Sequence, residues 1–111
     1  MQGYYQHPTV HGQDLVFVCE DDLWWADLTG GVAQRLTAAR GRCRTPFFSP
    51  DGRYLAYTGR DEGYSEVYLL QADGGEPRRL TFLGADTSVV GWSPDGQWIY
   101  YTSNEGQPFL R

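Results

Sequence analysis

The sequence predicts an all-β fold made of four-stranded antiparallel sheets arranged as the blades of a β-propeller. Three pairs of short blocks carry this prediction, because each block recurs 44 residues later in the chain. The pairs are Ser49-Pro50-Asp51-Gly52 with Ser93-Pro94-Asp95-Gly96, Arg35-Leu36-Thr37 with Arg79-Leu80-Thr81, and Gly30-Gly31 with Gly74-Gly75. A fixed period of this length is typical of propeller blades, each of which contributes four strands.

The second repeat shows the expected strands of one blade. They are predicted at about residues 46–49, 54–58, 66–70 and 78–81, where β-branched and aromatic residues alternate with Gly-, Pro-, Asp- and Ser-rich segments. No segment has helical spacing of apolar residues. Strands such as Val67-Tyr68-Leu69-Leu70 are apolar on both faces, which indicates a sheet packed on both sides. A β-sandwich is the structural alternative, but it gives no reason for the fixed repeat.

The Ser-Pro-Asp-Gly blocks are predicted to form tight turns between the first and second strands of a blade. Serine suits the first position of a type I turn, and proline pre-sets φ at the second. Aspartate can bond back to the backbone, and glycine takes the position that needs a free φ. Ser49 and Ser93 are therefore expected to build turns rather than act as nucleophiles, since neither lies in a G-x-S-x-G motif.

The repeat divides the single domain, residues 1–111, into about two and a half blades. The first is predicted at about residues 5–40, the second at about 41–84, and a truncated third from about residue 85. Such an arc would leave an apolar sheet face bare at each end. Bare faces and unpaired edges favour pairing between chains, so self-association is predicted.

Composition and charge narrow the classes of partner. The formal net charge is −5, which argues against a nucleic-acid partner. No segment approaches the ~20 apolar residues of a membrane span, and the N-terminus has no secretory signal. Cys19 and Cys43 lack zinc-site spacing and are expected to be reduced thiols in a cytoplasmic protein. No cofactor or metal is expected.

Three arginines, Arg40, Arg42 and Arg44, are the candidate binding residues. They lie between the first two blades. Because strand direction alternates, this connection shares a rim with the turns between second and third strands, including Glu20-Asp21-Asp22. The simpler interpretation, which we favour, is a solvated loop with weak surface ion pairs. The alternative is a charged rim that contacts peptide carboxylates or the next domain. Glu20-Asp21-Asp22 itself is expected to be a solvated turn.

Other candidate side chains receive structural interpretations. His7 and His11 are expected on one face of an extended strand, but two histidines alone make no metal site. The four tryptophans are expected mostly to pack between blades; they are Trp24, Trp25, Trp92 and Trp98. No nucleophile with its base, acid–base pair or metal set is present, so this chain is not expected to be an enzyme.

The opening blocks resemble the start of the tricorn protease family and its bacterial homologues. These blocks are Tyr4-Tyr5, His7-Pro8-Thr9-Val10-His11-Gly12, Val16-Phe17-Val18 and Glu20-Asp21-Asp22-Leu23-Trp24. The repeat blocks and residues 84–92 continue the likeness over essentially the whole chain. The Ser-Pro-Asp-Gly and Arg-Leu-Thr blocks are less specific, because they also occur in TolB-like and prolyl-oligopeptidase propellers with WD40-like repeats.

The resemblance implies the front of a six-bladed propeller, followed in the family by a seven-bladed propeller, a PDZ domain and a serine-protease core. Such proteins are cytoplasmic peptidases whose propellers conduct and filter peptides. The implied role is a non-catalytic segment that gates or scaffolds peptide access to a distant core, with the catalytic Ser and His far beyond residue 111. The alternative is a stand-alone module that binds a protein partner. What the gene encodes after Arg111 would separate the two.

Overall fold

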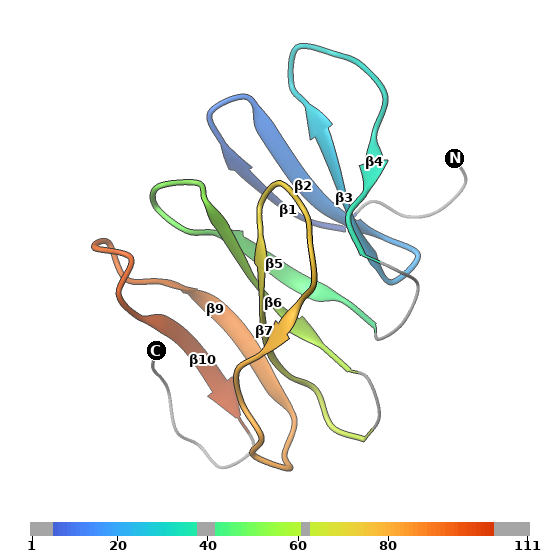
Figure 1. The fold of residues 1–111 in the computed structure, drawn as a ribbon. Coiled ribbons are helices and arrows are strands. Elements are labelled where there is room, and N and C mark those ends of the chain that lie inside the picture. The colour runs from blue at the N-terminus through green and yellow to red at the C-terminus, as the bar shows by residue number, and fades with distance from the viewer. Residues whose placement is uncertain (1–5, 38–41, 61–62, 104–111) are drawn as a thin grey trace.

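The computed structural model describes residues 6–37, 42–60 and 63–103. Within these ranges the chain forms three antiparallel sheets and no helix. Figure 1 shows the three sheets stacked side by side in the order of the chain. The predicted fold class, antiparallel four-stranded blades of a β-propeller, is confirmed.

Each sheet is a meander, in which strands that are consecutive in the chain are also neighbours in space. The first sheet contains β1 (Gln6–His11), β2 (Asp14–Cys19), β3 (Asp22–Asp27) and β4 (Gln34–Arg35). The second contains β5 (Arg44–Phe48), β6 (Tyr54–Gly59), β7 (Glu66–Gln71) and β8 (Arg78–Arg79). The third contains β9 (Thr87–Trp92) and β10 (Ile99–Ser103) in the described residues. We refer to these sheets as the first, second and third blades.

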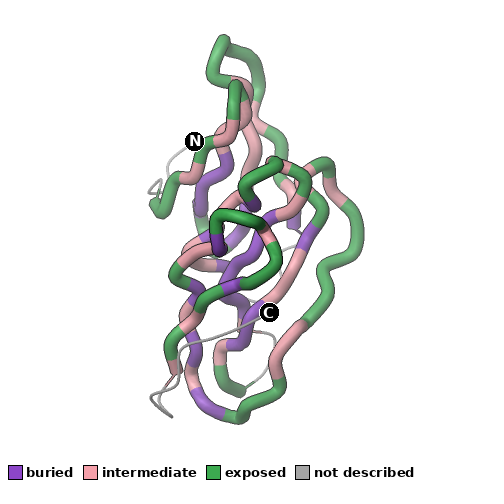
Figure 2. Tube along the Cα trace, turned by 90° about the vertical axis from the view of Figure 1, so that its left-hand side faces the viewer, coloured by how far each residue is buried: buried purple, intermediate pink, exposed green. Residues whose placement is uncertain are grey.

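The second blade is packed on both faces. Successive residues of β6 point in opposite directions, so Leu55 joins a core cluster with Val16 and Val18 of the first blade. Its neighbour Ala56 joins a second cluster with Val89 of the third blade. Figure 2 shows buried residues running through the stack and exposed residues at the turns. This two-sided burial explains why the strand lacks a polar face.

The Arg-Leu-Thr block fastens the outer strand of the second blade. The Thr81 hydroxyl accepts a hydrogen bond from the Val67 amide at 2.9 Å and donates to Glu66 Oε1 at 2.6 Å. Arg79 pairs with the other Glu66 oxygen at 3.4 Å. Because the Thr81 side chain takes the place of a backbone acceptor, β8 ends at Arg79 rather than at residue 81 as predicted.

The first blade repeats this arrangement and corrects one expectation. Thr37 accepts a hydrogen bond from the Leu23 amide at 3.1 Å and donates to Asp22 at 2.7 Å. Arg35 lies 3.7 Å from the same carboxylate. The interpretation of Glu20-Asp21-Asp22 as a solvated turn is therefore wrong at Asp22. Its side chain is buried because it starts β3 and supplies the acceptor that Thr37 needs.

Exposed apolar side chains lie on both outer blades. On the third blade, Val90, Trp98 and Tyr100 are 52%, 45% and 43% exposed. On the first blade, Phe17 and Cys19 alternate with the core residues of β2 and so point away from the second blade, yet they are buried. Both have partners within the chain. The first blade is thus not bare at Phe17 and Cys19, whereas its Val10, Leu28 and Val32 are 53%, 50% and 83% exposed.

The two cysteines, Cys19 and Cys43, are buried. Burial raises the pKa of the Cys43 thiol to about 11, so this group is protonated near neutral pH. A protonated, buried thiol is a poor nucleophile, and Cys43 serves here as a small apolar side chain in the cluster between the first two blades.

Candidate functional site

A cavity of about 340 Å³ opens on the rim formed by the connections between blades. We call it the basic rim cavity. Its lining residues come from all three blades: His7, Arg42, Arg44, Thr45, Thr58, Arg60, Ser65 and Ser88. Of the three arginines proposed from the sequence, it brings together Arg42 and Arg44, and Arg40 lies outside the described residues.

Two strained residues shape one side of this cavity. His7 has a φ of 52° and Thr45 a φ of 45°, both in the left-handed region that side chains other than glycine seldom adopt. Each lies at a register shift near the start of its strand, between β1 and β2 and between β5 and β6. Such bulges re-aim side chains, and both residues line the cavity.

The bulge in β1 also separates the two histidines. It inserts one extra residue between Gln6 and Thr9, so the alternation of side chains is interrupted. The expectation that His7 and His11 share one face is therefore wrong. His7 lines the basic rim cavity, whereas His11 Nε2 lies 3.1 Å from the Pro50 carbonyl oxygen at the opposite rim.

Positive charge predominates around the cavity. Arg44 forms an exposed ion pair with Asp21 at 2.7 Å, and Arg60 lies 3.4 Å from Asp86. Exposed pairs of this kind contribute about 0–1 kcal/mol and are easily exchanged for another anion. Arg42 forms no ion pair with any residue that the structure describes. A guanidinium group can bind a carboxylate in a bidentate manner.

Hydroxyl groups complete the lining. The Thr45 and Thr58 hydroxyls are 2.7 Å apart, and the Ser65 hydroxyl donates to the Thr87 carbonyl oxygen at 2.9 Å. A hydrogen bond from the Ser65 backbone amide is the largest cause that lowers the pKa of Asp86, so Asp86 stays ionised beside Arg60. Arginines and hydroxyls in one cavity can bind an anion.

Sequence reasoning missed Arg60 and gave His7 no binding role. A signal for Arg60 was present, because the turn between the second and third strands shares a rim with the connection between blades. Arg60 begins that turn in the second blade. No signal identified His7, since the bulge that aims it depends on pairing with β2.

The predicted turn residues lie at the opposite rim. In the second blade the Gly52 amide donates to the Ser49 carbonyl oxygen at 2.8 Å, and the Ser49 hydroxyl donates to Asp51 at 2.7 Å. The latter bond is the main cause that lowers the pKa of Asp51. The third blade repeats both bonds at 3.0 and 2.6 Å, with Ser93, Pro94, Asp95 and Gly96 in place of Ser49, Pro50, Asp51 and Gly52.

The tryptophans divide between packing and exposure. Trp92 packs on the cluster between the second and third blades, and its indole N–H donates to the Phe47 carbonyl oxygen at 2.9 Å. Trp25 packs on the cluster between the first and second. Trp98 differs from the expectation of inter-blade packing, because it is 45% exposed. Trp24 is partly buried in β3.

Comparison with known proteins decides the family. The model of the tricorn protease N-terminal β-propeller domain matches residues 2–111. The chain belongs to this family. The second tricorn protease homolog of Streptomyces coelicolor is 49% identical over 74 residues, which cover 66% of this chain and 6% of that relative. The tricorn protease of Thermoplasma acidophilum is 33% identical over 73 residues, which cover 63% of this chain and 7% of that protease.

Solved structures agree with the family assignment. The crystal structure of the tricorn protease superposes with a TM-score of 0.81 at 28% identity, over 92% of this chain and 11% of that chain. A TolB from Agrobacterium tumefaciens superposes with a TM-score of 0.78 at 24% identity, over 93% of this chain and 39% of that one, and shows the fold alone. The chain therefore spans a small part of its relatives. Its described residues contain no helix that could cross a membrane and no group of three or more potential metal ligands.

Proposed function

We propose that this chain is a non-catalytic propeller segment of a tricorn-like serine peptidase, and that it gates or scaffolds the access of peptides to a distant protease core. One observation carries the proposal: three arginines and His7 line one cavity to which all three blades contribute residues. Membership of the tricorn propeller family supports it. Such a segment would act in the cytoplasm beside the other blades and domains of its parent chain.

The segment itself would be an arc of about two and a half blades, with boundaries near residues 40 and 84. First strands line the central channel of a propeller, and here β1 contacts β5 and β5 contacts β9. The basic rim cavity would then lie at the mouth of that channel. Exposed arginines at a channel mouth attract carboxylates weakly and release them quickly, as passage of peptides requires.

The proposal predicts that the chain binds peptides through their C-terminal carboxylate. A short peptide with a free C-terminus should bind at least about fivefold more tightly than its amide, as measured by NMR titration. Arg42→Gln should reduce this preference, because Arg42 forms no competing ion pair among the described residues. Raising the salt concentration should weaken binding.

Arg78→Gln is the matched control for this test. Arg78 is an exposed arginine on β8 that does not line the basic rim cavity. The Arg78→Gln substitution removes the same charge from the chain, so it should leave the preference for the free C-terminus unchanged. Equal binding of the free and amidated peptides would contradict the assigned role, and so would equal losses in both variants.

The exposed face of the third blade predicts self-association of the chain. Val90, Trp98 and Tyr100 form an apolar surface of the kind that blades bury against one another. Sedimentation velocity at micromolar concentration should show dimers or larger species, and Tyr100→Glu should shift the distribution toward monomer. A monodisperse monomer that folds cooperatively would contradict this prediction.

A further inference from the structure

A second and larger cavity, of about 560 Å³, lies between the first and second blades at the rim opposite the basic rim cavity. We call it the inter-blade groove. One wall is formed by residues on or next to β2, β3 and β4 of the first blade, and the other by the end of β5 and the two turns that flank β6 and β7 in the second. None of its lining residues belongs to the basic rim cavity. It is therefore a separate site.

An immobilised indole forms part of the first wall. Trp25 packs on the core between the blades, and its indole N–H donates to Asp14 Oδ1 at 2.8 Å. Phe48 and Tyr54 line the groove from the second blade. The packing and the hydrogen bond fix the ring before any ligand arrives, so little side-chain entropy is lost on binding.

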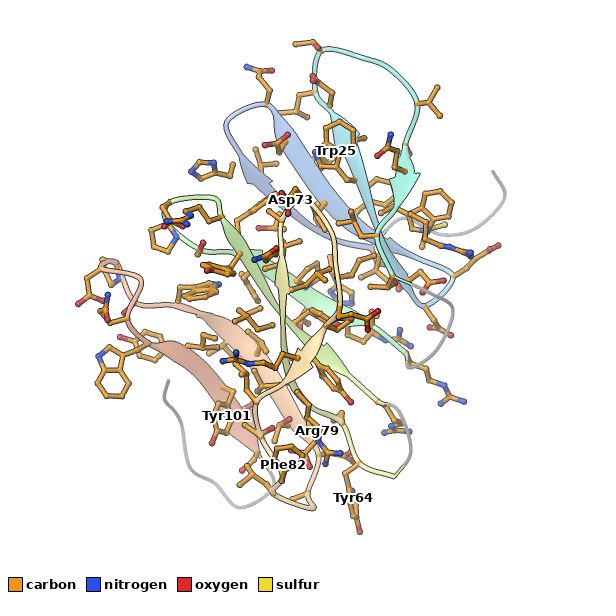
Figure 3. The ribbon with its side chains drawn as sticks, in the orientation of Figure 1. Trp25, Tyr64, Asp73, Arg79, Phe82 and Tyr101 are labelled. Atoms are coloured by element: carbon orange, nitrogen blue, oxygen red, sulfur yellow. The ribbon has the colours of Figure 1, made fainter. Side chains whose placement is uncertain are left out.

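Carboxylates lie beside this aromatic wall. The second oxygen of Asp14 makes no hydrogen bond or ion pair with a described residue. The Asp73 side chain also makes no hydrogen bond or ion pair with a described residue. Asp73 is exposed and follows β7. Figure 3 shows Trp25 on the first blade and Asp73 on the second. Arg53 also lines the groove, which leaves an excess of one negative charge.

We propose that the inter-blade groove binds an arginine side chain of a polypeptide, with the guanidinium stacked on Trp25 and paired with Asp14 and Asp73. Guanidinium groups stack on aromatic faces and match carboxylates in a bidentate manner, so an indole beside two available carboxylates suits this side chain. The volume accommodates the side chain and its flanking backbone. This binding does not depend on the proposed role of the basic rim cavity.

The full chain can be titrated with an acetylated and amidated Gly-Arg-Gly tripeptide and observed by NMR. These blocked ends remove the carboxylate that the basic rim cavity would bind. The indole N–H signal of Trp25 is assigned by its loss in Trp25→Phe. This signal should shift as the peptide is added and reach a plateau when the groove is saturated. The citrulline tripeptide keeps the shape without the charge and should bind at least tenfold more weakly.

Two variants test the carboxylates. Asp73→Asn should weaken binding of the arginine tripeptide about three- to tenfold. Glu76→Gln should not, because Glu76 lies in the same turn but outside the groove. No shift of the Trp25 signal at millimolar peptide would overturn the proposal. Equal binding of the citrulline peptide, or equal effects of the two variants, would overturn it as well.

Discussion

Replacement of Glu66 by alanine is expected to lower the free energy of unfolding by about 3–4 kcal/mol. The Glu66 side chain is almost fully buried, yet its carboxylate accepts hydrogen bonds from the Thr81 hydroxyl and from the Leu83 and Gly84 amides, at 2.6 to 3.2 Å. Alanine would leave these donors without an acceptor. It would also release the segment that leads from β8 into the third blade. Urea denaturation followed by circular dichroism measures the loss.

The same site predicts a dependence on pH. Desolvation raises the pKa of Glu66, but the hydrogen bonds from Thr81, Leu83 and Gly84 and the charge of Arg79 outweigh it, so the net pKa is lowered. The contribution of this carboxylate is fully present above its unfolded-state pKa. It is lost as the pH falls through the lower folded-state pKa. The difference in stability between the wild type and Glu66→Gln should therefore narrow from about pH 6 to about pH 3.

An exposed glutamate provides the control. Glu76 lies in the turn between β7 and β8, so Glu76→Gln should cost almost nothing. A loss for Glu66→Ala no larger than that for Glu76→Gln would show that the hydrogen bonds from Thr81, Leu83 and Gly84 do not stabilise the fold.

Gly52→Val should destabilise the chain by about 3–4 kcal/mol, and more than Gly96→Val does. Both glycines close a Ser-Pro-Asp-Gly turn, with φ of 76° and 75°, so a β-branched residue is strained at each by about 1–3 kcal/mol. The surroundings differ. A Cβ at Gly52 would overlap the His11 ring, whereas one at Gly96 would lie 3.7 Å from Pro50, an ordinary contact.

A double-mutant cycle separates strain from overlap. In a His11→Ala background the ring is absent, so the loss caused by Gly52→Val should fall to that of Gly96→Val. Thermal denaturation of the wild type, the two single variants and the double variant measures the backbone strain and the overlap with His11 separately. Equal losses at the two glycines with His11 in place would contradict the proposed contact between the first strand and the next blade's turn.

The strands and turns of this chain could be predicted because they are encoded locally and repeated. Proline and glycine at set positions specify a turn, and runs that are apolar on both faces specify a sheet packed on both sides. The predicted strand at residues 54–58 and the observed β6, Tyr54–Gly59, differ by one residue. Repetition of each block 44 residues later gave an internal check that a single copy lacks.

The sites depended on contacts between blades, which no local pattern encodes. In the sequence, Asp22 is one of three acids in a predicted turn. In the structure it is buried and accepts a hydrogen bond from Thr37, which follows the outer strand. His7 and Arg60 are more than 50 residues apart, and only the bulge in β1 and the stacking of blades bring both to one cavity. By itself the sequence determined the repeat, the strands and the turns. The tertiary structure alone decided which charged side chains are buried and which share a cavity, because burial and proximity arise when sheets stack.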